Sequence, residues 1–407
     1  MKRISVWAGI LLALSPLCIH AEPWAFDEPV AVTSTHGEKI FHHLESSGRR
    51  NIAISGDTVA VAWEDDRDGT PRIYLANKQL DDEAFAGEIR ISGPGEAYEP
   101  SLVALGDNRY ALAWEEDAKI HLRLVTPDKL GPVIMLEAEE AMQSSLTRHD
   151  QGLLVAFSRR DGRYGLVSMQ PIRVDGLALQ PGSGCAVDPE PARAEQLYPA
   201  IVSLGDRIIV AWEDRRAGHT IIMASQSDNT KSCQFHGPQR VSDEIIDRTA
   251  VYGKGHGVAR VALARYGDSK VLAAWADKRD FRAGYDIYSA DYQPGKKQLF
   301  GTNVRVQDDF GGLAEQWHTT VAGDDSGRLV VAWDDRRDDN ADIVLSWLED
   351  GQWSDDFVVP GASGTGEQNH PTISLDSSGN LHLAWIQRKS VNGPTQVLYA
   401  FGRLINK

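Results

Sequence analysis

The stretch VVAWDDRRDD, residues 330–339, returns in altered form at three other places in this chain. The related stretches are VAVAWEDDRD from Val59, IIVAWEDRRA from Ile208 and VLAAWADKRD from Val271. In each copy an apolar run ends in tryptophan, an acidic residue follows two positions later, and an arginine follows two positions after that. A pattern repeated in this way indicates one structural unit copied along the chain.

Weaker copies bring the number of anchor positions to seven, and the residues around each anchor predict short strands. The anchors are Trp63, Trp114, Phe157, Trp212, Trp275, Trp333 and Trp385. Apolar residues before each anchor, as in NRYALAW, are typical of a half-buried or buried strand. Another strand precedes it across a turn, and two more follow, as in RIYLAN and GEIRIS. Four short strands repeated seven times, without helical periodicity, predict an all-β, seven-bladed propeller.

The two ends of the chain predict how this ring closes. The seventh copy stops after its third strand, TQVLYAFGRL, and lacks a fourth. The segment PWAFDEPVAVTS from Pro23 resembles QWSDDFVVPGAS, the fourth strand of the sixth copy. We therefore expect the N-terminal segment to complete the seventh blade, because this pairs strand edges that would otherwise be exposed. Residues 22–407 would then form a single domain.

Residues 1–21, MKRISVWAGILLALSPLCIHA, predict a signal peptide, with Lys2 and Arg3 before an apolar stretch and Ala21 at the cleavage position. A lipoprotein at Cys18 is disfavoured because Pro and Leu precede that cysteine. No later apolar run could span a bilayer, so we expect a periplasmic or secreted monomer without membrane insertion. The net charge of −16 argues against nucleic acid as a partner. Cys185 and Cys233 remain, either as a disulfide or as two free thiols.

The repeats resemble those of the sialidase-like group of β-propellers. The hallmark of that group is a Ser-x-Asp-x-Gly-x-x-Trp turn between the third and fourth strands. Fragments of it stand here as SADYQPG at residues 289–295 and EDGQW at residues 349–353. The resemblance covers almost the whole chain after residue 21 and implies the propeller fold, while activity is a separate question.

The acid and arginine that follow the tryptophan have a structural interpretation. Positions two apart in a strand face the same side, so the anchor, the acid and the arginine share a face. An ion pair at the end of that strand could bridge neighbouring blades or hold the next turn. The predicted structural pairs are Asp65 with Arg67, Asp214 with Arg216, Asp277 with Arg279, and Asp335 with Arg337.

The residues just before the first strands predict a ligand-binding mouth, because ligand sites of such rings lie near the central channel. The candidate ligand-binding residues are Arg49, Glu99, Tyr198, Trp317, His318 and His370, with Gln143 at the equivalent position of the third copy. Candidate catalytic residues are His318, Tyr252 and His256. No metal-binding spacing is present, so we expect no metal and no cofactor. Acidic turns such as DDRRDD leave calcium open.

Two functions remain open, and we favour the first of them. One is a non-catalytic scaffold that binds a protein or glycan across the mouth. The other is a sialidase-like glycoside hydrolase or a polysaccharide lyase acting on an extracellular glycan. A sialidase needs three converging arginines, an Arg-Ile-Pro strand and a Tyr–Glu pair. The chain has no Arg-Ile-Pro, and Tyr198 with Glu195 is available as a Tyr–Glu pair. An enzyme also requires converging titratable groups with shifted pKa values.

Overall fold

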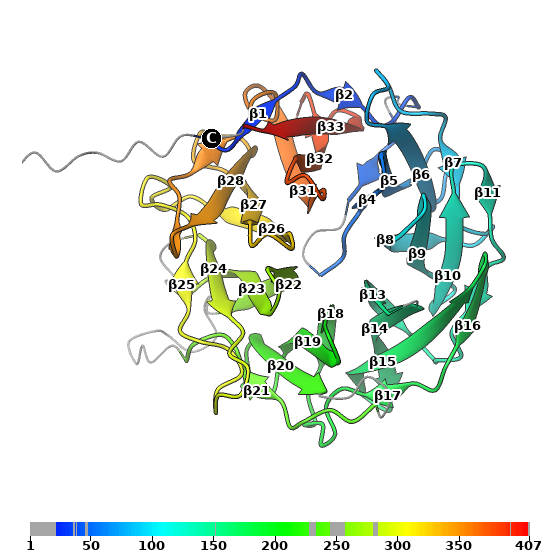
Figure 1. The fold of residues 1–407 in the computed structure, drawn as a ribbon, viewed down its shortest axis with the longest axis vertical. Helices are drawn as coiled ribbons and strands as arrows, with labels where there is room; N and C mark the ends of the chain where they lie inside the picture. Colours follow the sequence, from blue (N-terminus) through cyan, green and yellow to red (C-terminus); the bar gives the residue numbers. More distant parts are fainter. Residues whose placement is uncertain are drawn as a thin grey trace, which may run out of the picture.

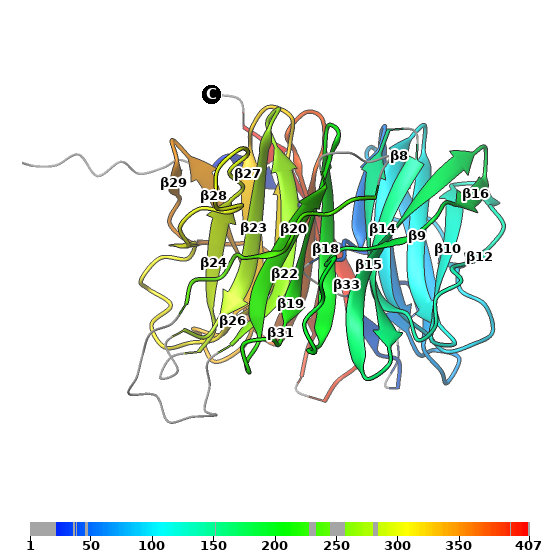
Figure 2. The same ribbon diagram turned by 90° about the horizontal axis from the view of Figure 1, so that it is seen from below.

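Seven small antiparallel sheets stand around a central channel (Figure 1), and seen from the side they form one disc (Figure 2). The computed structural model describes residues 22–35, 37, 39–44, 48–150, 152–227, 233–244, 257–279, 284–390 and 392–405. The predicted signal peptide, residues 1–21, lies outside these residues. The prediction of an all-β, seven-bladed propeller is confirmed. The blades are numbered here in chain order.

The first three blades cover the N-terminal part of the ring. Blade 1 consists of β3 (His42–His43), β4 (Ile52–Ser55), β5 (Thr58–Asp65), β6 (Arg72–Gln79) and β7 (Ile89–Arg90). Blade 2 consists of β8 (Ala97–Gly106), β9 (Arg109–Glu116), β10 (Lys119–Thr126), β11 (Lys129–Leu130) and β12 (Ile134–Met135). Blade 3 consists of β13 (Met142–His149), β14 (Gly152–Asp161), β15 (Tyr164–Asp175), β16 (Ala178–Pro181) and β17 (Cys185–Ala186).

The remaining four blades complete the circle. Blade 4 consists of β18 (Gln196–Leu204), β19 (Arg207–Asp214), β20 (Ile221–Ser227) and β21 (Gln239–Arg240). Blade 5 consists of β22 (Val258–Tyr266), β23 (Lys270–Asp277), β24 (Asp286–Asp291) and β25 (Val304–Arg305). Blade 6 consists of β26 (Gln316–Gly323), β27 (Leu329–Asp335), β28 (Asp342–Glu349), β29 (Gln352–Trp353) and β30 (Phe357–Val358). Blade 7 consists of β31 (Glu367–Leu375), β32 (Leu381–Arg388), β33 (Thr395–Leu404), β1 (Trp24–Phe26) and β2 (Val30–Ala31).

The N-terminal strands close the ring as predicted. Trp24 pairs with Leu404, and Val30 pairs with Tyr399, so β1 and β2 together form the outer edge of blade 7. The indole of Trp24 donates a 2.9 Å hydrogen bond to the carbonyl of Gly379 and meets the ring of Trp347 edge to face. The two ends of the chain are therefore held in one sheet.

The anchor tryptophans are fully buried between blades, and each hydrogen-bonds the residue two positions later. The Nε1 atom of Trp63 donates to Asp65 at 2.8 Å, and that of Trp333 donates to Asp335 at 3.1 Å. Trp114, Trp212 and Trp275 make the same bond to Glu116, Asp214 and Asp277. Five of the seven anchors are thus fixed both by packing and by a carboxylate, whereas Trp385 bonds the side-chain amide oxygen of Gln387 and Phe157 is held by packing.

In the four copies that carry the arginine, it pairs with that carboxylate and reaches a further acid. Arg216 lies 2.8 Å from Asp214 and 2.6 Å from Asp188, a residue that follows the outer strand of blade 3. Hydrogen bonds to Asp214 raise the pKa of Arg216. The bond from the backbone N–H of Arg216 to Asp214 holds the turn after the strand. The pairs Asp65–Arg67, Asp277–Arg279 and Asp335–Arg337 make the same contact.

The innermost strand of blade 1 consists of two separate pieces, β3 and β4, and residues 48–51, which precede β4, lie toward the centre of the ring (Figure 1). The carbonyl of Gly48 accepts a hydrogen bond from Ser145 of blade 3, and a side chain at residue 48 would stand 2.8 Å from Cβ of Ala200 of blade 4. The carbonyl of Arg50 accepts a 2.7 Å bond from Leu102 N–H. Residues 48–51 therefore cross the channel, in contact with several blades.

Two further observations complete the fold. A disulfide joins Cys185 in β17 to Cys233, with their Cα atoms 6.0 Å apart, and so links the outer parts of blades 3 and 4. The part of the chain that the structure describes contains no helix that could cross a membrane.

Candidate functional site

Six blades begin their innermost strand with a β-bulge on the same face of the ring, called here the mouth. The register of each strand shifts at this point, and the bulged residue has a positive φ between 48° and 60°. A bulge re-aims the side chain that it carries. The six bulged residues are Glu99, Gln143, Tyr198, Arg260, His318 and His370.

The structure thus places five of the predicted mouth residues at equivalent positions: Glu99, Gln143, Tyr198, His318 and His370. Arg260, the bulged residue of blade 5, was missed in the sequence. The signal was present, because VARVAL from Val258 repeats the spacing of LYPAIV from Leu197, with a small residue two positions after the bulge. The insertion DEIIDRTAVYGKGHG, residues 243–257, precedes this strand and obscured its alignment with the other first strands.

A second set of residues missed in the sequence supports the bulges. These are acids directly after the anchor: Glu64, Glu115, Glu213 and Asp334. Glu213 accepts the backbone N–H of Arg260 at 2.8 Å, and Asp334 accepts that of His370 at 3.0 Å. Glu64 and Glu115 do the same for Glu99 and Gln143 of the next blade. An acid directly after the anchor in four of seven copies was the available signal.

On one side of the mouth, two arginines converge on one tyrosine. The guanidinium carbon of Arg260 lies 3.3 Å from the ring centre of Tyr198, and that of Arg49 lies 5.4 Å from it. Arg49 also pairs with Glu99 at 2.8 Å. Arg49 is only 2% exposed, whereas Glu99, Tyr198 and Arg260 are half-buried. Arg49 therefore holds Glu99 and Tyr198 from below, and the other three reach solvent.

Two carboxyl groups beneath this cluster have raised pKa values. Burial, together with the nearby charge of Glu99, raises the pKa of Glu115 to about 8. Burial also raises the pKa of Glu213, although Arg260 opposes the shift. Perturbed carboxyl groups that converge at the mouth of a fold are a common feature of functional sites, and structural ion-pair networks can also produce them.

The raised pKa of Glu115 predicts a pH dependence of stability. Between its ordinary value of 4.5 and about 8, the unfolded chain releases this proton while the folded chain retains it. Stability should therefore fall as the pH rises through this range. We expect Glu115→Gln to make the free energy of unfolding less dependent on pH over this range, because the variant lacks the titrating group. The measurement is the free energy of unfolding by urea at several pH values.

The exposed Glu139 provides a matched control. Glu139→Gln should leave the pH dependence of the wild type unchanged. If the free energy of unfolding changed equally with pH in Glu115→Gln and the wild type, Glu115 would titrate like an ordinary surface carboxyl group.

On the other side of the mouth, histidines from three blades meet. The rings of His318 and His370 are stacked with centres 3.7 Å apart, and His43 meets His370 edge to face at 4.9 Å. Nδ1 of His318 lies 2.5 Å from Oδ2 of Asp334. Burial acts to raise the pKa of Asp334, but the neighbouring His318 and His370 outweigh it and hold this pKa below its usual value. Trp317 packs against Tyr285, with ring centres 4.0 Å apart.

The other predicted site residues have different positions. Tyr252 and His256 lie outside the described residues. Glu195 does not contact Tyr198 in the way a nucleophile pair requires; it accepts a 2.7 Å hydrogen bond from Gly165 N–H and faces Arg160. Among the described residues, no group of three or more His, Cys, Asp or Glu side chains could hold a metal ion.

Comparison with known proteins finds likeness of fold alone. No protein-family model matches the chain, and no curated protein sequence matches it. The polysaccharide lyase Uly1 matches with a TM-score of 0.62 and 9% identity, covering 94% of this chain and 100% of the lyase. A Dyadobacter fermentans protein of unknown function matches with a TM-score of 0.54 and 13% identity, covering 95% of this chain and 100% of that protein. The Penicillium chrysogenum α-L-arabinanase matches with a TM-score of 0.51 and 10% identity, covering 92% of this chain and 98% of the arabinanase.

Proposed function

We propose that this protein is an exported, monomeric binding propeller that holds a glycan across its mouth. The observation that carries the proposal is the contrast between two repeated positions. The anchor is tryptophan in six of the seven blades, and the residue two places later is an acid in five of them, as a structural position should be. The bulged position has the same backbone in six blades but carries glutamate, glutamine, tyrosine, arginine and histidine. A constant backbone that presents varied polar side chains suits the recognition of an asymmetric ligand.

The chemistry of the mouth favours a sugar with hydroxyl and acidic groups. Glu99, Gln143 and the histidines offer hydrogen bonds to hydroxyl groups, and Arg260 offers a charged donor for a carboxylate. Trp317 offers an aromatic face at the rim. The glycan-active proteins with the same fold make this ligand class a reasonable first choice over a protein partner.

Catalysis by β-elimination is the second candidate, favoured by the carboxyl group of Glu115 with its pKa of about 8. In such a reaction a base removes the proton from the carbon next to the uronate carboxylate. The bond to the neighbouring glycosidic oxygen breaks, and the leaving oxygen gains a proton. The guanidinium of Arg260, which lies over the ring of Tyr198 and reaches solvent, could neutralise the carboxylate. His318, held by Asp334, is a further proton carrier.

The test is titration calorimetry with a panel of neutral and uronate-containing oligosaccharides. For the ligand that binds, Tyr198→Ala and His370→Ala should each weaken binding by about tenfold or more, since each removes a central contact. Asp350→Ala, on an outer hairpin far from the mouth, is the matched control and should bind like the wild type. Unchanged affinity in both mouth variants would exclude the mouth as the binding site.

The same samples separate binding from catalysis. Ultraviolet absorbance of an unsaturated sugar product would identify elimination, and Glu115→Gln should then change the pH profile of the rate. Binding without product would leave the scaffold as the function.

A further inference from the structure

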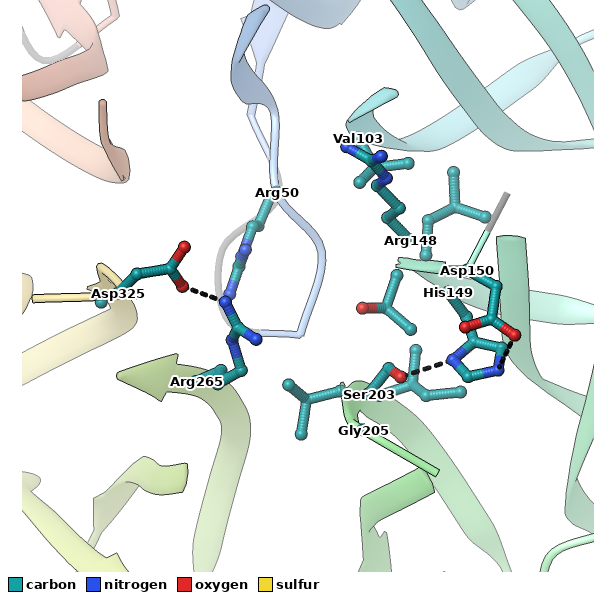
Figure 3. Close-up of a pocket in the computed structure, with 14 residues that line it drawn as sticks. Arg50, Val103, Arg148, His149, Asp150, Ser203, Gly205, Arg265 and Asp325 are labelled. Atoms are coloured by element: carbon teal, nitrogen blue, oxygen red, sulfur yellow. Dashed lines mark hydrogen bonds and ion pairs between the residues drawn. The ribbon is translucent and has the colours of Figure 1, made fainter. Parts of the chain in front are cut away.

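A cavity lies at the end of the channel opposite the mouth. It has a volume of about 450 Å³ and is lined by the ends of the innermost strands and the hairpins that follow them. Figure 3 shows Arg50 entering it from the channel, with Arg265 and Asp325 on one side and Arg148, His149 and Ser203 on the other. The proposed glycan site does not include any of these residues.

Three arginines from three different blades line this cavity. Arg50 comes from blade 1, Arg148 from β13 of blade 3 and Arg265 from β22 of blade 5. Arg49 and Arg50 are consecutive and take opposite sides of the crossing segment, so one guanidinium faces the mouth and the other faces this cavity. Such a concentration of positive charge contrasts with a chain of net charge −16.

The carboxylates around the cavity are already engaged. Asp325 pairs with Arg265, and Asp150 lies 3.3 Å from Nε2 of His149. The other ring nitrogen of His149 is bonded to Ser203 at 2.7 Å. Neither of these acids is available to Arg50 or Arg148.

Arg50 and Arg148 have no carboxylate partner among the residues that the structure describes. The guanidinium of Arg50 donates to the carbonyl of Leu263 at 3.0 Å, and burial lowers the pKa of Arg50. A guanidinium withdrawn from water without a counter-charge is unfavourable, and an arriving anion would relieve this cost. The planar fork of a guanidinium group fits the oxygens of a carboxylate or sulfate group.

We propose that this cavity binds an oxyanion, a carboxylate or sulfate group of an acidic ligand, between Arg50, Arg148 and Arg265. His149 and Ser203 supply hydrogen-bonding atoms in the wall of the same cavity. The site is separate from the mouth, so an acidic polymer could be held at either face of the ring.

The test uses the full chain with inorganic sulfate, sodium acetate or sodium glucuronate, each at constant ionic strength against sodium chloride. Specific binding raises the Tm of the wild type in a saturable way. Arg148→Gln and Arg265→Gln replace exposed side chains, and each should weaken the apparent affinity by about tenfold. Arg90→Gln, an exposed arginine of β7, is the matched control and should behave like the wild type.

The outcomes distinguish the sources of the anion. General exclusion of a salt from the protein surface raises the Tm of every variant alike. A smaller rise in Tm in the arginine variants than in the wild type therefore reports binding at this cavity. A response to sulfate alone would identify a sulfate ester, and a response to acetate or glucuronate would identify a carboxylate. Equal responses in the wild type, Arg148→Gln and Arg265→Gln would overturn the proposal. Mouth variants should leave the response to inorganic sulfate unchanged, so failure of this anion site is separable from failure of the glycan site.

Discussion

Replacing Asp335 by alanine is expected to lower the free energy of unfolding by about 3–4 kcal/mol, because this carboxylate holds four hydrogen bonds in a buried position. Asp335 is 1% exposed and accepts from Trp333 Nε1 at 3.1 Å, from Arg337 N–H at 2.9 Å, and from two guanidinium nitrogens at 3.0 and 2.6 Å. The substitution leaves all these donors without that partner. Only Arg337 retains other acids, Asp308 and Asp356. Urea unfolding of the variant measures the loss.

The same stretch of sequence contains the control. Asp338 is exposed and lies three residues further along, so Asp338→Ala should change stability by less than about 0.5 kcal/mol. If the two alanine variants were equally stable, the acid two places after the anchor would have no structural role in the ring.

Trp24→Ala is expected to cost about 3–5 kcal/mol, because it removes a buried indole from the strand that closes the ring. Trp24 is 4% exposed, and it contacts Trp347 and the carbonyl of Gly379. Since β1 and β2 are the outer strands of blade 7, loss of this contact should also expose the edge of β33. Calorimetric unfolding gives the energetic effect, and hydrogen exchange at residues 395–404 gives the local one.

Trp24→Phe separates packing from hydrogen bonding. It retains most of the apolar contact and should cost about 1–2 kcal/mol. Ala25, which is exposed in the same strand, serves as a neutral position for Ala25→Ser. A Trp24→Ala variant as stable as the wild type would mean that the stability of the ring does not depend on the packing of strand β1 against blade 7.

The propeller could be predicted because its determinants are local and repeated. Each anchor stands in an apolar strand with turn residues at fixed distances, and the incomplete seventh copy indicated that the N-terminal segment must supply a strand. The length of the outer strands could not be read in the same way. Several are only two residues long, as in β21 and β25, or are split in two, as in β29 and β30. Few contacts hold an outer edge, so its residues carry little pattern.

The mouth was predictable in place but not in detail. The residues before the first strands were expected there, but nothing in the sequence showed that Glu99, Tyr198 and His318 adopt positive φ, since none is glycine. The acids that support these bulges directly follow the anchor, so their side chains point to the opposite face of the strand. Glu115 and Asp334 were therefore missed when only residues two positions apart, which share the face of the anchor, were compared. The path of residues 48–51 through the channel depends on contacts with distant blades, which no local pattern records.

The central claim is that the bulged residues of the mouth bind the ligand, and a crystal structure of the complex tests it most directly. For the oligosaccharide with the highest affinity in the calorimetric panel, we predict electron density over the mouth in contact with at least three of the six bulged residues. Density only at the outer edge of a blade, or at the opposite end of the channel, would contradict this account of the mouth.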